Sequence, residues 1–300
     1  ANLVAGTGYY INIAATAVRD TAGNAYAGIT NATTLNFTTA DANGVITVSS
    51  TASTGDTWVY LGEEMAAYLA PKIAKNDPVT QEQIWMEPLG LIGNISAWNY
   101  PYNVGFNIFI PALLAGNAVF YKPSEFVGLT GNALALIFEQ VGLPPHLFNL
   151  IQGDGSSGKA LIDAGLDAYF FTGSYATGCK IAQHLAPQLK PLQLELGGKD
   201  PLYIMEDVVD VKQAAINAAE GAFYNAGQSC CAIERIYVHA AIYDEFVAYF
   251  CEEVKQYKVG NPAEEGTFIG PLTRAAQLDF LTAQIADAIE KGASVLLGGK

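Results

Sequence analysis

The sequence predicts an α/β fold in which a doubly wound parallel sheet is followed by part of a second α/β domain and preceded by a small all-β segment. Three observations indicate this. Between residues 91 and 196, short β-like runs alternate with helical stretches, as in parallel sheets with crossover helices. Hydrophobic residues make up 51% of the 300 residues and charged residues 15%, which suits a large buried core. Before Lys72 the only basic residue is Arg19, and Thr, Ala and Asn are abundant.

The N-terminal segment has the pattern of strands. Residues 9–14 and 34–38 alternate polar with apolar side chains, as half-buried strands do. Asp-Thr-Ala-Gly-Asn at 20–24 predicts a turn between them. Residues 1–42 resemble the C-terminal end of a bacterial immunoglobulin-like repeat of surface proteins, and half of such a sandwich cannot bury its inner face. Residues 43–60, rich in Ser, Thr and Gly, are predicted to form a linker.

The remaining elements follow from hydrophobic periodicity. A helix is predicted over residues 63–74. Five strands are predicted at 91–97, 118–121, 148–152, 168–172 and 192–196, with helices between them at 106–115, 129–141, 158–164 and 176–185. After Gly198 a second unit is predicted, with helices at 211–223, 243–257 and 277–291 and strands at 235–239 and 294–297. The last of these strands has no following segment with which to pair.

Composition excludes several classes of function. The net charge of −14 and the pI near 4.5 disfavour nucleic acid as a partner, because phosphate contacts need an excess of Lys and Arg. No apolar run is long enough to cross a bilayer, so no membrane partner is expected. The four cysteines are too sparse for a disulfide scaffold and have no metal-ligand spacing, so we expect a reducing, cytoplasmic compartment and no metal site.

Cys230 is the most informative residue for chemistry. A lone cysteine usually packs as a small hydrophobe. Cys230, however, follows Gly227 in a Gly-containing segment, and Glu195 stands upstream in Leu-Glu-Leu-Gly-Gly-Lys at 194–199. A thiol and a carboxylate of this kind indicate a nucleophile and its base. The three histidines are scattered, so a Cys–His pair is not required by this interpretation.

Polar residues follow the predicted strands, where ligands bind in open α/β sheets. Asn99 follows the first strand and offers a neutral donor for an oxyanion, or it forms a turn. Lys122 and Glu125 follow the second strand and can contact a ribose or phosphate, or they form a solvated loop. Ser174 follows the fourth strand, where it can mark a phosphate site at a helix start or act as an ordinary N-cap.

The segment Gly-Asp-Gly-Ser-Ser-Gly at 153–158 matches the dinucleotide-binding fingerprint literally. The fingerprint is expected after the first strand of a unit, whereas this copy follows the third predicted strand. We therefore discount it as a phosphate-binding loop, although its glycines can still let a cofactor approach.

Taken together, these segments are similar to the NAD(P)-dependent aldehyde dehydrogenase family over residues 86–300. The motifs that carry the resemblance are Pro-Leu-Gly at 88–90, Trp-Asn-Tyr-Pro at 98–101, Lys-Pro-Ser-Glu at 122–125, Phe-Thr-Gly-Ser at 171–174, Glu-Leu-Gly-Gly-Lys at 195–199, Gly-Gln-Ser-Cys at 227–230 and Gly-Pro-Leu at 270–272. The resemblance implies an NAD-binding Rossmann-like domain at 61–196 and part of the catalytic domain at 197–300.

The resemblance also implies a mechanism. Cys230, rather than Cys231, would attack an aldehyde to form a thiohemiacetal, and Asn99 with the Cys230 backbone N–H would stabilise the oxyanion. Hydride transfer to NAD would leave a thioester. Glu195 would activate water to hydrolyse it, with a pKa raised towards neutrality by partial burial.

The resemblance further implies the cofactor contacts. Lys122 and Glu125 would hold the adenosine ribose and Ser174 the pyrophosphate, and the Glu125 carboxylate would favour NAD over NADP by repelling a 2′-phosphate. The full set of expected contacts is Trp98, Lys122, Ser124, Glu125, Gly155, Phe171, Thr172, Gly173, Ser174, Leu196 and Gly197.

The chain also departs from the family pattern. Ala97 stands where many members have Pro, and members, which are usually homo-oligomers, extend past both ends of the match, including the region for oligomerisation. Two alternatives therefore stay open. The chain can be an inactive truncated or chimeric fragment whose immunoglobulin-like start is its real context. It can also be an acylating member that passes the thioester to coenzyme A or phosphate, although Glu195 favours hydrolysis.

Overall fold

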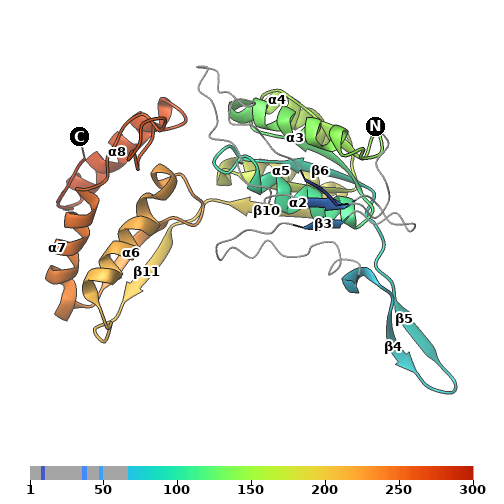
Figure 1. The fold of residues 1–300 in the computed structure, drawn as a ribbon, viewed down its shortest axis with the longest axis horizontal. Helices are drawn as coiled ribbons and strands as arrows, with labels where there is room; N and C mark the ends of the chain where they lie inside the picture. Colours follow the sequence, from blue (N-terminus) through green and yellow to red (C-terminus); the bar gives the residue numbers. More distant parts are fainter. Residues whose placement is uncertain (1–7, 11–35, 39–46, 50–66, 300) are drawn as a thin grey trace. The chain divides into compact units, whose positions relative to one another are not determined.

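The structure is a computed structural model that describes residues 8–10, 36–38, 47–49 and 67–299 (Figure 1). The chain divides into two compact units, residues 1–195 and 196–300. The division falls within one strand, β10 (Leu192–Leu196). The roles that the sequence predicts for the two parts, cofactor binding and catalysis, stay predictions.

The first unit is built on a five-stranded parallel sheet, which confirms the predicted fold class. Its strands are β6 (Leu91–Ile95), β7 (Ala118–Lys122), β8 (Phe148–Leu150), β9 (Ala168–Gly173) and β10. Their order across the sheet is β10-β9-β6-β7-β8. The chain thus builds outward from β6 in one direction through β7 and β8, and then returns to the other side of β6 with β9. The reversal point of a doubly wound sheet lies between β6 and β9.

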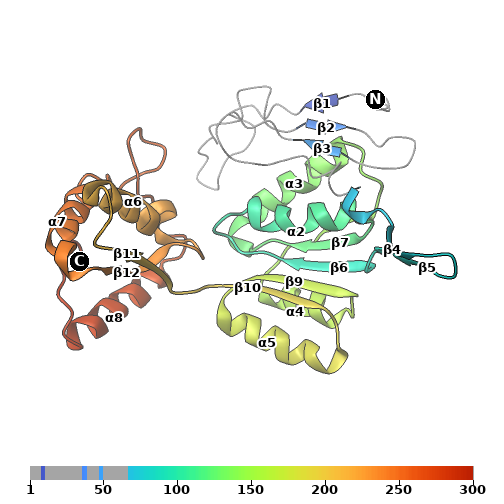
Figure 2. The same ribbon diagram turned by 90° about the horizontal axis from the view of Figure 1, so that it is seen from below.

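Helices cover both faces of this sheet. Figure 2 shows α2 (Asn103–Leu114) and α3 (Gly128–Gln140) on one face, and α4 (Gly155–Asp163) and α5 (Tyr175–Leu185) on the other. Each helix lies within a few residues of its predicted range. Parallel strands buried on both faces are apolar throughout, and this explains why these strands could be recognised as short continuous hydrophobic runs.

Aromatic side chains fill the core on the α2 and α3 side of the sheet. Phe109 on α2 is fully buried, and its ring meets three others edge-on. The centroids lie 5.1 Å from Tyr121 on β7, 5.7 Å from Phe138 on α3 and 5.1 Å from Phe148 on β8. Such edge-to-face pairs each contribute about 0.5–1.5 kcal/mol beyond the burial of their area. The Phe109 ring thereby packs α2 against α3, β7 and β8.

Three short strands precede the α/β unit. β1 (Gly8–Tyr10), β2 (Asn36–Thr38) and β3 (Thr47–Ser49) form an antiparallel sheet in the order β1-β2-β3. β1 overlaps the start of the strand predicted at 9–14, β2 lies in the strand predicted at 34–38, and β3 lies in the segment predicted as a linker. The predicted turn at 20–24 falls outside the described residues.

The helix predicted over residues 63–74 is wrong at its C-terminal end. The described helical residues end at Leu69, and β4 (Lys72–Asn76) pairs antiparallel with β5 (Gln81–Ile84). Pro71 accounts for the stop, because a proline disfavours helical backbone at the residue before it. The Asp77 carboxylate closes the hairpin turn by accepting hydrogen bonds from the N–H groups of Val79 and Thr80 at 2.9 and 2.8 Å.

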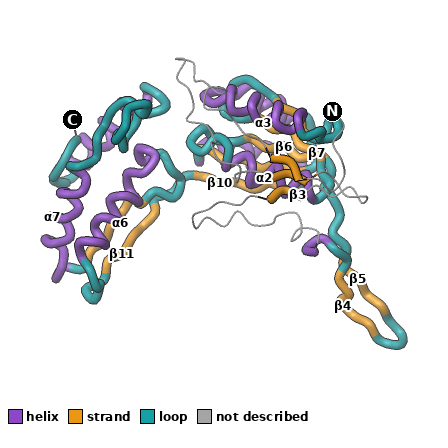
Figure 3. Tube along the Cα trace, viewed as in Figure 1, coloured by secondary structure: helices purple, strands orange, loops and turns teal. Residues whose placement is uncertain are grey.

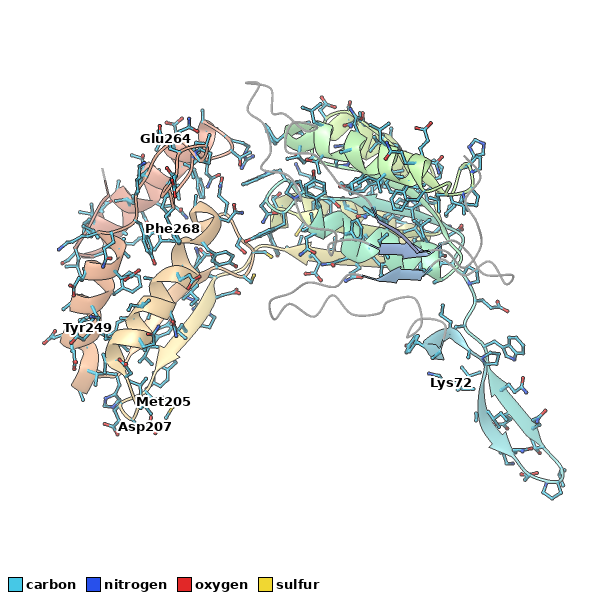
Figure 4. All side chains as sticks on the ribbon, viewed as in Figure 1. Lys72, Met205, Asp207, Tyr249, Glu264 and Phe268 are labelled. Atoms are coloured by element: carbon cyan, nitrogen blue, oxygen red, sulfur yellow. The ribbon has the colours of Figure 1, made fainter. Side chains whose placement is uncertain are left out.

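The side chains of both hairpin strands are exposed along their whole length. Lys72, labelled in Figure 4, places its Nζ 4.6 Å from the centroid of the Tyr68 ring. This cation–π contact connects the base of the hairpin to the helical turn before it.

The second unit contains a two-stranded parallel sheet, β11 (Asp200–Ile204) and β12 (Ile233–Val238), connected by α6 (Val211–Phe223). Helix α7 (Tyr243–Val254) packs on α6, and α8 (Ala276–Glu290) follows (Figure 3). The core of this unit contains Ile204, Ala215, Ala218 and Phe246. Lys212 Nζ lies 5.7 Å from the ring centroid of Tyr249, and the ring centroids of Phe268 and Tyr257 lie 4.2 Å apart; Tyr249 and Phe268 are labelled in Figure 4.

Two predictions about this unit need correction. Strand β11 was not predicted, because Asp-Pro at its start has the signature of a turn. The strand predicted at 294–297 is irregular backbone. A strand is held by its ladder of hydrogen bonds, and no described segment pairs with these residues.

Across the described residues, every helix is too short or too polar to cross a membrane.

Tyr169 supplies a test of the packing in the first unit. Its hydroxyl accepts a hydrogen bond from Leu166 N at 2.8 Å and donates one to Ile162 O at 3.0 Å, and its side chain is 1% exposed. We expect Tyr169→Phe to lower the free energy of unfolding by about 1–3 kcal/mol, because it leaves two buried backbone groups unsatisfied. Urea titration followed by tryptophan fluorescence reports on this unit, since all three tryptophans lie before Asn99.

The matched control is Tyr68→Phe, which removes a hydroxyl from a tyrosine that is 58% exposed. It should change the free energy of unfolding by less than about 0.5 kcal/mol. Equal effects of the two substitutions would contradict a structural role for the Tyr169 hydroxyl.

Candidate active site

The parallel strands bring most of the predicted cofactor residues to one edge of the sheet. The carboxyl ends of β6, β7 and β9 lie at the same edge because the strands are parallel. The residues that follow these ends are Trp98 and Asn99 after β6, Ser124 and Glu125 after β7, and Ser174 after β9. This edge at the reversal point is where ligands bind in doubly wound sheets.

Lys122 is the most unusual charge at this edge. It ends β7 and is 3% exposed, yet it carries an ammonium group. Its Nζ donates a hydrogen bond to Pro123 O at 3.0 Å and lies 3.9 Å from Glu125 Oε2. Desolvation lowers the pKa of Lys122, and the carboxylates of Glu125 and Asp154 partly offset that effect. A desolvated ammonium gains interaction energy from any anionic group that reaches it.

Gly158 lies next to the side chain of Lys122. Gly158 is buried in α4, and a Cβ atom there would lie 3.6 Å from Lys122 Cδ, in van der Waals contact. At Gly155, by contrast, an added Cβ would meet nothing within 4 Å. The predicted importance of Gly155 therefore has no packing basis in this unit, and its role in cofactor binding stays a prediction.

The N-termini of α4 and α5 differ in their capacity to bind an anion. Helix α4, which opens in the fingerprint-like segment, is capped by Asp154, whose Oδ1 accepts from Ser156 N at 2.9 Å. That hydrogen bonding lowers the pKa of Asp154, so a carboxylate already stands at this helix end. Helix α5 is capped by neutral Ser174, whose Oγ accepts from Thr177 N at 3.4 Å and donates to Thr177 Oγ1 at 2.9 Å. The geometry favours α5 over α4 for a phosphate.

Phe171, Thr172 and Gly173 occupy the end of β9 immediately before this cap. The Phe171 ring is 7% exposed and lies over Gly173, where an added Cβ would come within 2.5 Å of the ring. Glycine is therefore required here by close packing in the first unit. This packing explains the motif without reference to a ligand, and contact of these three residues with a cofactor stays a prediction.

The loop that carries Trp98 and Asn99 is held by a buried polar network that sequence reasoning missed. Asn94 on β6 is 1% exposed, and its Nδ2 donates to Gly105 O at 3.2 Å while its Oδ1 accepts from Ser96 Oγ at 3.2 Å. The Tyr121 hydroxyl, whose pKa burial raises to about 12, donates to Pro101 O at 3.5 Å. An asparagine within an apolar strand run was the sequence signal for this network.

Glu195 differs from its prediction in exposure. It ends the first unit on β10 and is exposed, with Gln193 Nε2 donating to its Oε1 at 3.4 Å. The partial burial that was expected is therefore absent from the described structure. The cause is strand periodicity, because Gln193 and Glu195 share one face of β10 while the three leucines of β10 share the half-buried face.

Cys230 lies in the second unit, in an exposed turn between α6 and β12. The preceding residues Asn225, Ala226 and Gly227 all have left-handed backbone, with φ values of 51°, 56° and 71°. Gln228 connects this segment to the residue that follows the predicted Gly-Pro-Leu motif, because its Oε1 accepts from Thr273 N at 3.0 Å. The structure thus brings two predicted motifs of this unit together. Leu196 and Gly197 begin this unit, where Leu196 ends the strand that Glu195 also occupies and Gly197 follows it.

The neighbouring thiol, Cys231, was not predicted to have a role. Its Sγ lies 3.1 Å from Tyr224 Oη and 3.3 Å from Ser229 Oγ. Hydrogen bonds from Ser229 and Tyr224 lower the pKa of Cys231. No three His, Cys, Asp or Glu side chains in the described part of the chain gather as metal ligands would.

The fold and the polar residues at the sheet edge place the protein in the Rossmann-like, doubly wound α/β class. The particular family follows from sequence. The chain belongs to the aldehyde dehydrogenase family, because the sequence profile described as "Aldehyde dehydrogenase family" matches residues 29–300.

Individual relatives agree with this assignment. The chain is 40% identical over 232 residues to 3,6-anhydro-alpha-L-galactose dehydrogenase of Vibrio sp. (strain EJY3), covering 76% of this chain and 48% of the relative. A 4,4′-diapolycopene aldehyde oxidase of Methylomonas sp. is 40% identical over 216 residues, covering 72% of this chain and 40% of the relative. The chain therefore spans about half the length, or less, of the curated relatives it matches.

Solved structures show the same likeness. A 3,6-anhydro-L-galactose dehydrogenase in complex with NADP matches with a TM-score of 0.74 and 37% identity, over 79% of this chain and 50% of that one. A Mycobacterium tuberculosis aldehyde dehydrogenase complexed with NAD+ matches with a TM-score of 0.73 and 38% identity, over 76% of this chain and 47% of that one.

These matches correct the interpretation of the N-terminal segment. The family profile begins at residue 29, within residues 1–42 that were predicted to be immunoglobulin-like and well before residue 86, where the family resemblance was expected to start. The comparisons do not support an immunoglobulin-like repeat. Weak alternation of polar and apolar residues in a strand pair is common to many β structures, so it is not specific to an immunoglobulin-like repeat.

Ala226 provides a test of the backbone before Cys230. A left-handed residue other than glycine costs about 1–2 kcal/mol, whereas glycine adopts this backbone freely. We expect Ala226→Gly to raise the free energy of unfolding of the second unit by about 0.5–1 kcal/mol. Urea titration followed by far-UV circular dichroism measures this change.

The control is Ala214→Gly in helix α6, which should lower the free energy of unfolding by about 1 kcal/mol. A loss of stability in Ala226→Gly similar to that in the control would show that the backbone at Ala226 is not strained.

Proposed function

We propose that this chain, as part of an aldehyde dehydrogenase, oxidises an aldehyde to a carboxylic acid with NAD. The observation that carries the proposal is Cys230, which follows Gly-Gln-Ser in an exposed turn of a chain that belongs to the aldehyde dehydrogenase family. We assign cofactor binding to the first unit and the nucleophile to the second.

The proposed chemistry begins at the Cys230 sulfur. The thiolate attacks the carbonyl carbon of the aldehyde and gives a thiohemiacetal, whose oxyanion accepts hydrogen bonds from Asn99 and from the Cys230 backbone N–H. When bound, NAD supplies the acceptor for the hydride that leaves the former carbonyl carbon. Glu195 then takes a proton from water, which attacks the resulting thioester and releases the carboxylic acid and the Cys230 thiol.

The residues of the first unit fit a dinucleotide. Lys122 presents a desolvated ammonium group at the carboxyl edge of the sheet, and Ser174 caps a helix whose N-terminus carries no carboxylate cap. We propose that Lys122 and Glu125 hold the adenosine ribose and that the start of α5 holds the pyrophosphate. Glu125 is exposed and negative, so it would repel a 2′-phosphate, and we propose NAD rather than NADP.

The substrate is proposed only at the level of the reacting group. One relative is named for an anhydro-galactose and another for a diapolycopene aldehyde, and these molecules share an aldehyde or its equivalent but little else. We therefore assign an aldehyde substrate without choosing the group attached to it.

The nucleophile can be tested directly. The purified chain is incubated with NAD and a panel of aldehydes while the absorbance of NADH is followed. We expect Cys230→Ala to abolish turnover and Cys251→Ala, which removes a half-buried thiol, to preserve it. Turnover that persists in Cys230→Ala would refute the assignment of the nucleophile.

The base has a separate test. We expect Glu195→Gln to slow turnover by about 10²–10⁴-fold, the usual contribution of a general base. In that variant an acyl group should accumulate on Cys230, where intact-protein mass spectrometry can detect it. The proposal fails if Glu195→Gln turns over at the normal rate.

We expect the charge of Lys122 to lower the stability of the fold and to strengthen the binding of NAD. Because its pKa is lowered from 10.5 in the folded state, its charge destabilises the fold at neutral pH, and this cost disappears as pH rises past 10.5. Lys122→Met should therefore keep or raise the melting temperature at pH 7, and this advantage should shrink in alkaline buffer. The same substitution should weaken NAD binding at least about tenfold, because a charge-assisted hydrogen bond is lost.

The control is Lys159→Met on α4, where the lysine side chain is 72% exposed. It should leave NAD binding unchanged in calorimetric titrations. Equal loss of binding in the two variants would argue that Lys122 acts only through the overall charge.

A further inference from the structure

The two parallel strands of the second unit begin next to two of the predicted motifs. β11 starts at Asp200, directly after the Gly-Gly-Lys segment, and β12 starts at Ile233, three residues after Cys230. The register of the pair places Asp200 opposite Ile233. The chain that follows Glu195 and the chain that follows Cys230 therefore enter the same end of one small sheet.

The ladder of this strand pair is interrupted at that end. Pro201 has no N–H to donate, and the register shifts by one residue between Asp200 and Pro201, which lies opposite Arg235. The Arg235 side chain supplies a hydrogen bond beside the interruption, because its Nε donates to Lys199 O at 2.8 Å. A hydrogen bond from an ionised donor is stronger than one between neutral groups.

The side chains around Arg235 add two weaker contacts. Lys199 Nζ forms an ion pair with Glu234 Oε2, and Arg235 Nη1 donates to Tyr237 Oη at 3.4 Å. Consecutive residues of β12 thus hold Lys199 by its ammonium group and by its carbonyl. The Lys199 side chain is 56% exposed, and exposed ion pairs contribute little. We therefore assign the larger share of the anchoring to Arg235.

Two glycines separate Glu195 from this anchor. Gly197 and Gly198 are exposed, and a Cβ atom at Gly197 would meet nothing within 4 Å. Glycine has more conformational freedom than any other residue. The four residues of chain from Glu195 to Lys199 reach at most about 14 Å, so a fixed Lys199 restricts the positions that the Glu195 carboxylate can take.

The chain between Cys230 and Arg235 has its own support. Ala232 is 2% exposed, and its N–H donates to Ser229 O at 3.4 Å. This turn and the start of β12 hold Cys230 by the backbone and by burial. The Arg235 side chain therefore matters for the segment that follows Glu195 rather than for the position of Cys230.

We propose that Arg235 is a positioning residue that acts on the reaction through Glu195. This role rests on the proposed function, in which Cys230 carries the acyl group and Glu195 activates water. Arg235 holds the Lys199 carbonyl and takes no part in bond making. Loss of its hydrogen bond leaves the acylation of Cys230 unchanged and slows the hydrolysis of the thioester, because only the second step needs the base.

The two steps can be separated with p-nitrophenyl acetate, without NAD or an aldehyde. The Cys230 thiolate attacks the ester carbonyl, the ester C–O bond breaks and p-nitrophenolate leaves, so its absorbance reports acylation. Water then attacks the thioester, the C–S bond breaks, and acetate and the thiol are released. For the full chain we expect a burst of p-nitrophenolate followed by a slower steady phase set by deacylation. Fragment-ion mass spectrometry should locate the acetyl group on Cys230.

Two substitutions of Arg235 test its role. Arg235→Leu should keep the burst and slow the steady phase at least about tenfold, because the base is no longer held in place. Arg235→Lys keeps the charge but has a methylene in place of Nε, so it should slow the steady phase to the same extent. Tyr237→Phe is the matched control, since it removes only the other partner of Arg235, and it should change neither phase. Far-UV circular dichroism verifies that each variant is folded.

A double-mutant cycle distinguishes positioning of the base from a general structural effect. If Arg235 acts through Glu195, adding Arg235→Leu to Glu195→Gln should slow the steady phase by less than about twofold, because the base is already absent. A general structural effect would repeat the full slowing in the Glu195→Gln background.

The results also separate this role from the proposed function. A chain without an acetyl group on Cys230, or a Glu195→Gln variant with a normal steady phase, would refute the proposed function and the role of Arg235 with it. If both of those expectations hold, the role of Arg235 alone would be overturned by any of three results. These are a normal steady phase in either Arg235 variant, a lost burst in folded Arg235→Leu, or full slowing in the double variant.

Discussion

The candidate site depends on the parallel pairing of β6 with its two neighbours. Because β6 pairs in parallel with both β7 and β9, the loops that follow these strands emerge at one edge. The pairing is fixed by burial on both faces, where rings such as Phe109 and Tyr121 interlock strands with helices. A shift of any strand by one residue would move its core side chains to the opposite face. The fold thereby sets the position of Lys122 and Ser174 before any ligand binds.

In this part of the first unit, a charged group and a polar group are buried, where the loss of hydration costs free energy. Lys122 is desolvated, and Asn94 lies in the middle of an apolar strand, yet each is satisfied by nearby oxygen atoms. Natural proteins tend to retain such features where binding requires them, since an apolar residue would pack more simply. The N-termini of α4 and α5 also differ in charge, because the carboxylate of Asp154 caps α4 and the neutral hydroxyl of Ser174 caps α5.

The sequence predicted the sheet well because crossover helices and apolar strands leave a regular alternation, and β6 to β10 lie where that alternation placed them. The sequence-based prediction failed where a single residue or a tertiary contact determines the local structure. Pro71 ended a helix that periodicity had extended, and β11 begins with a turn-like Asp-Pro pair. The exposure of Glu195 depends on which face of an edge strand it shares with Gln193. The hydroxyl cluster around Cys231 requires three side chains to meet in space, and linear spacing cannot show this. Residue types and motif order predicted the candidate catalytic residues, whose joint action stays a prediction.

The position of β10 has a consequence for the behaviour of fragments. This strand closes one side of the five-stranded sheet, and its neighbour β9 has the sequence Ala-Tyr-Phe-Phe-Thr-Gly, with four of its first five residues apolar or aromatic. A chain cut before Leu192 would leave the backbone donors and acceptors of β9 uncovered next to that run of rings. Such an edge is a template for intermolecular strand pairing. Residues 192–196 therefore also protect the first unit from aggregation.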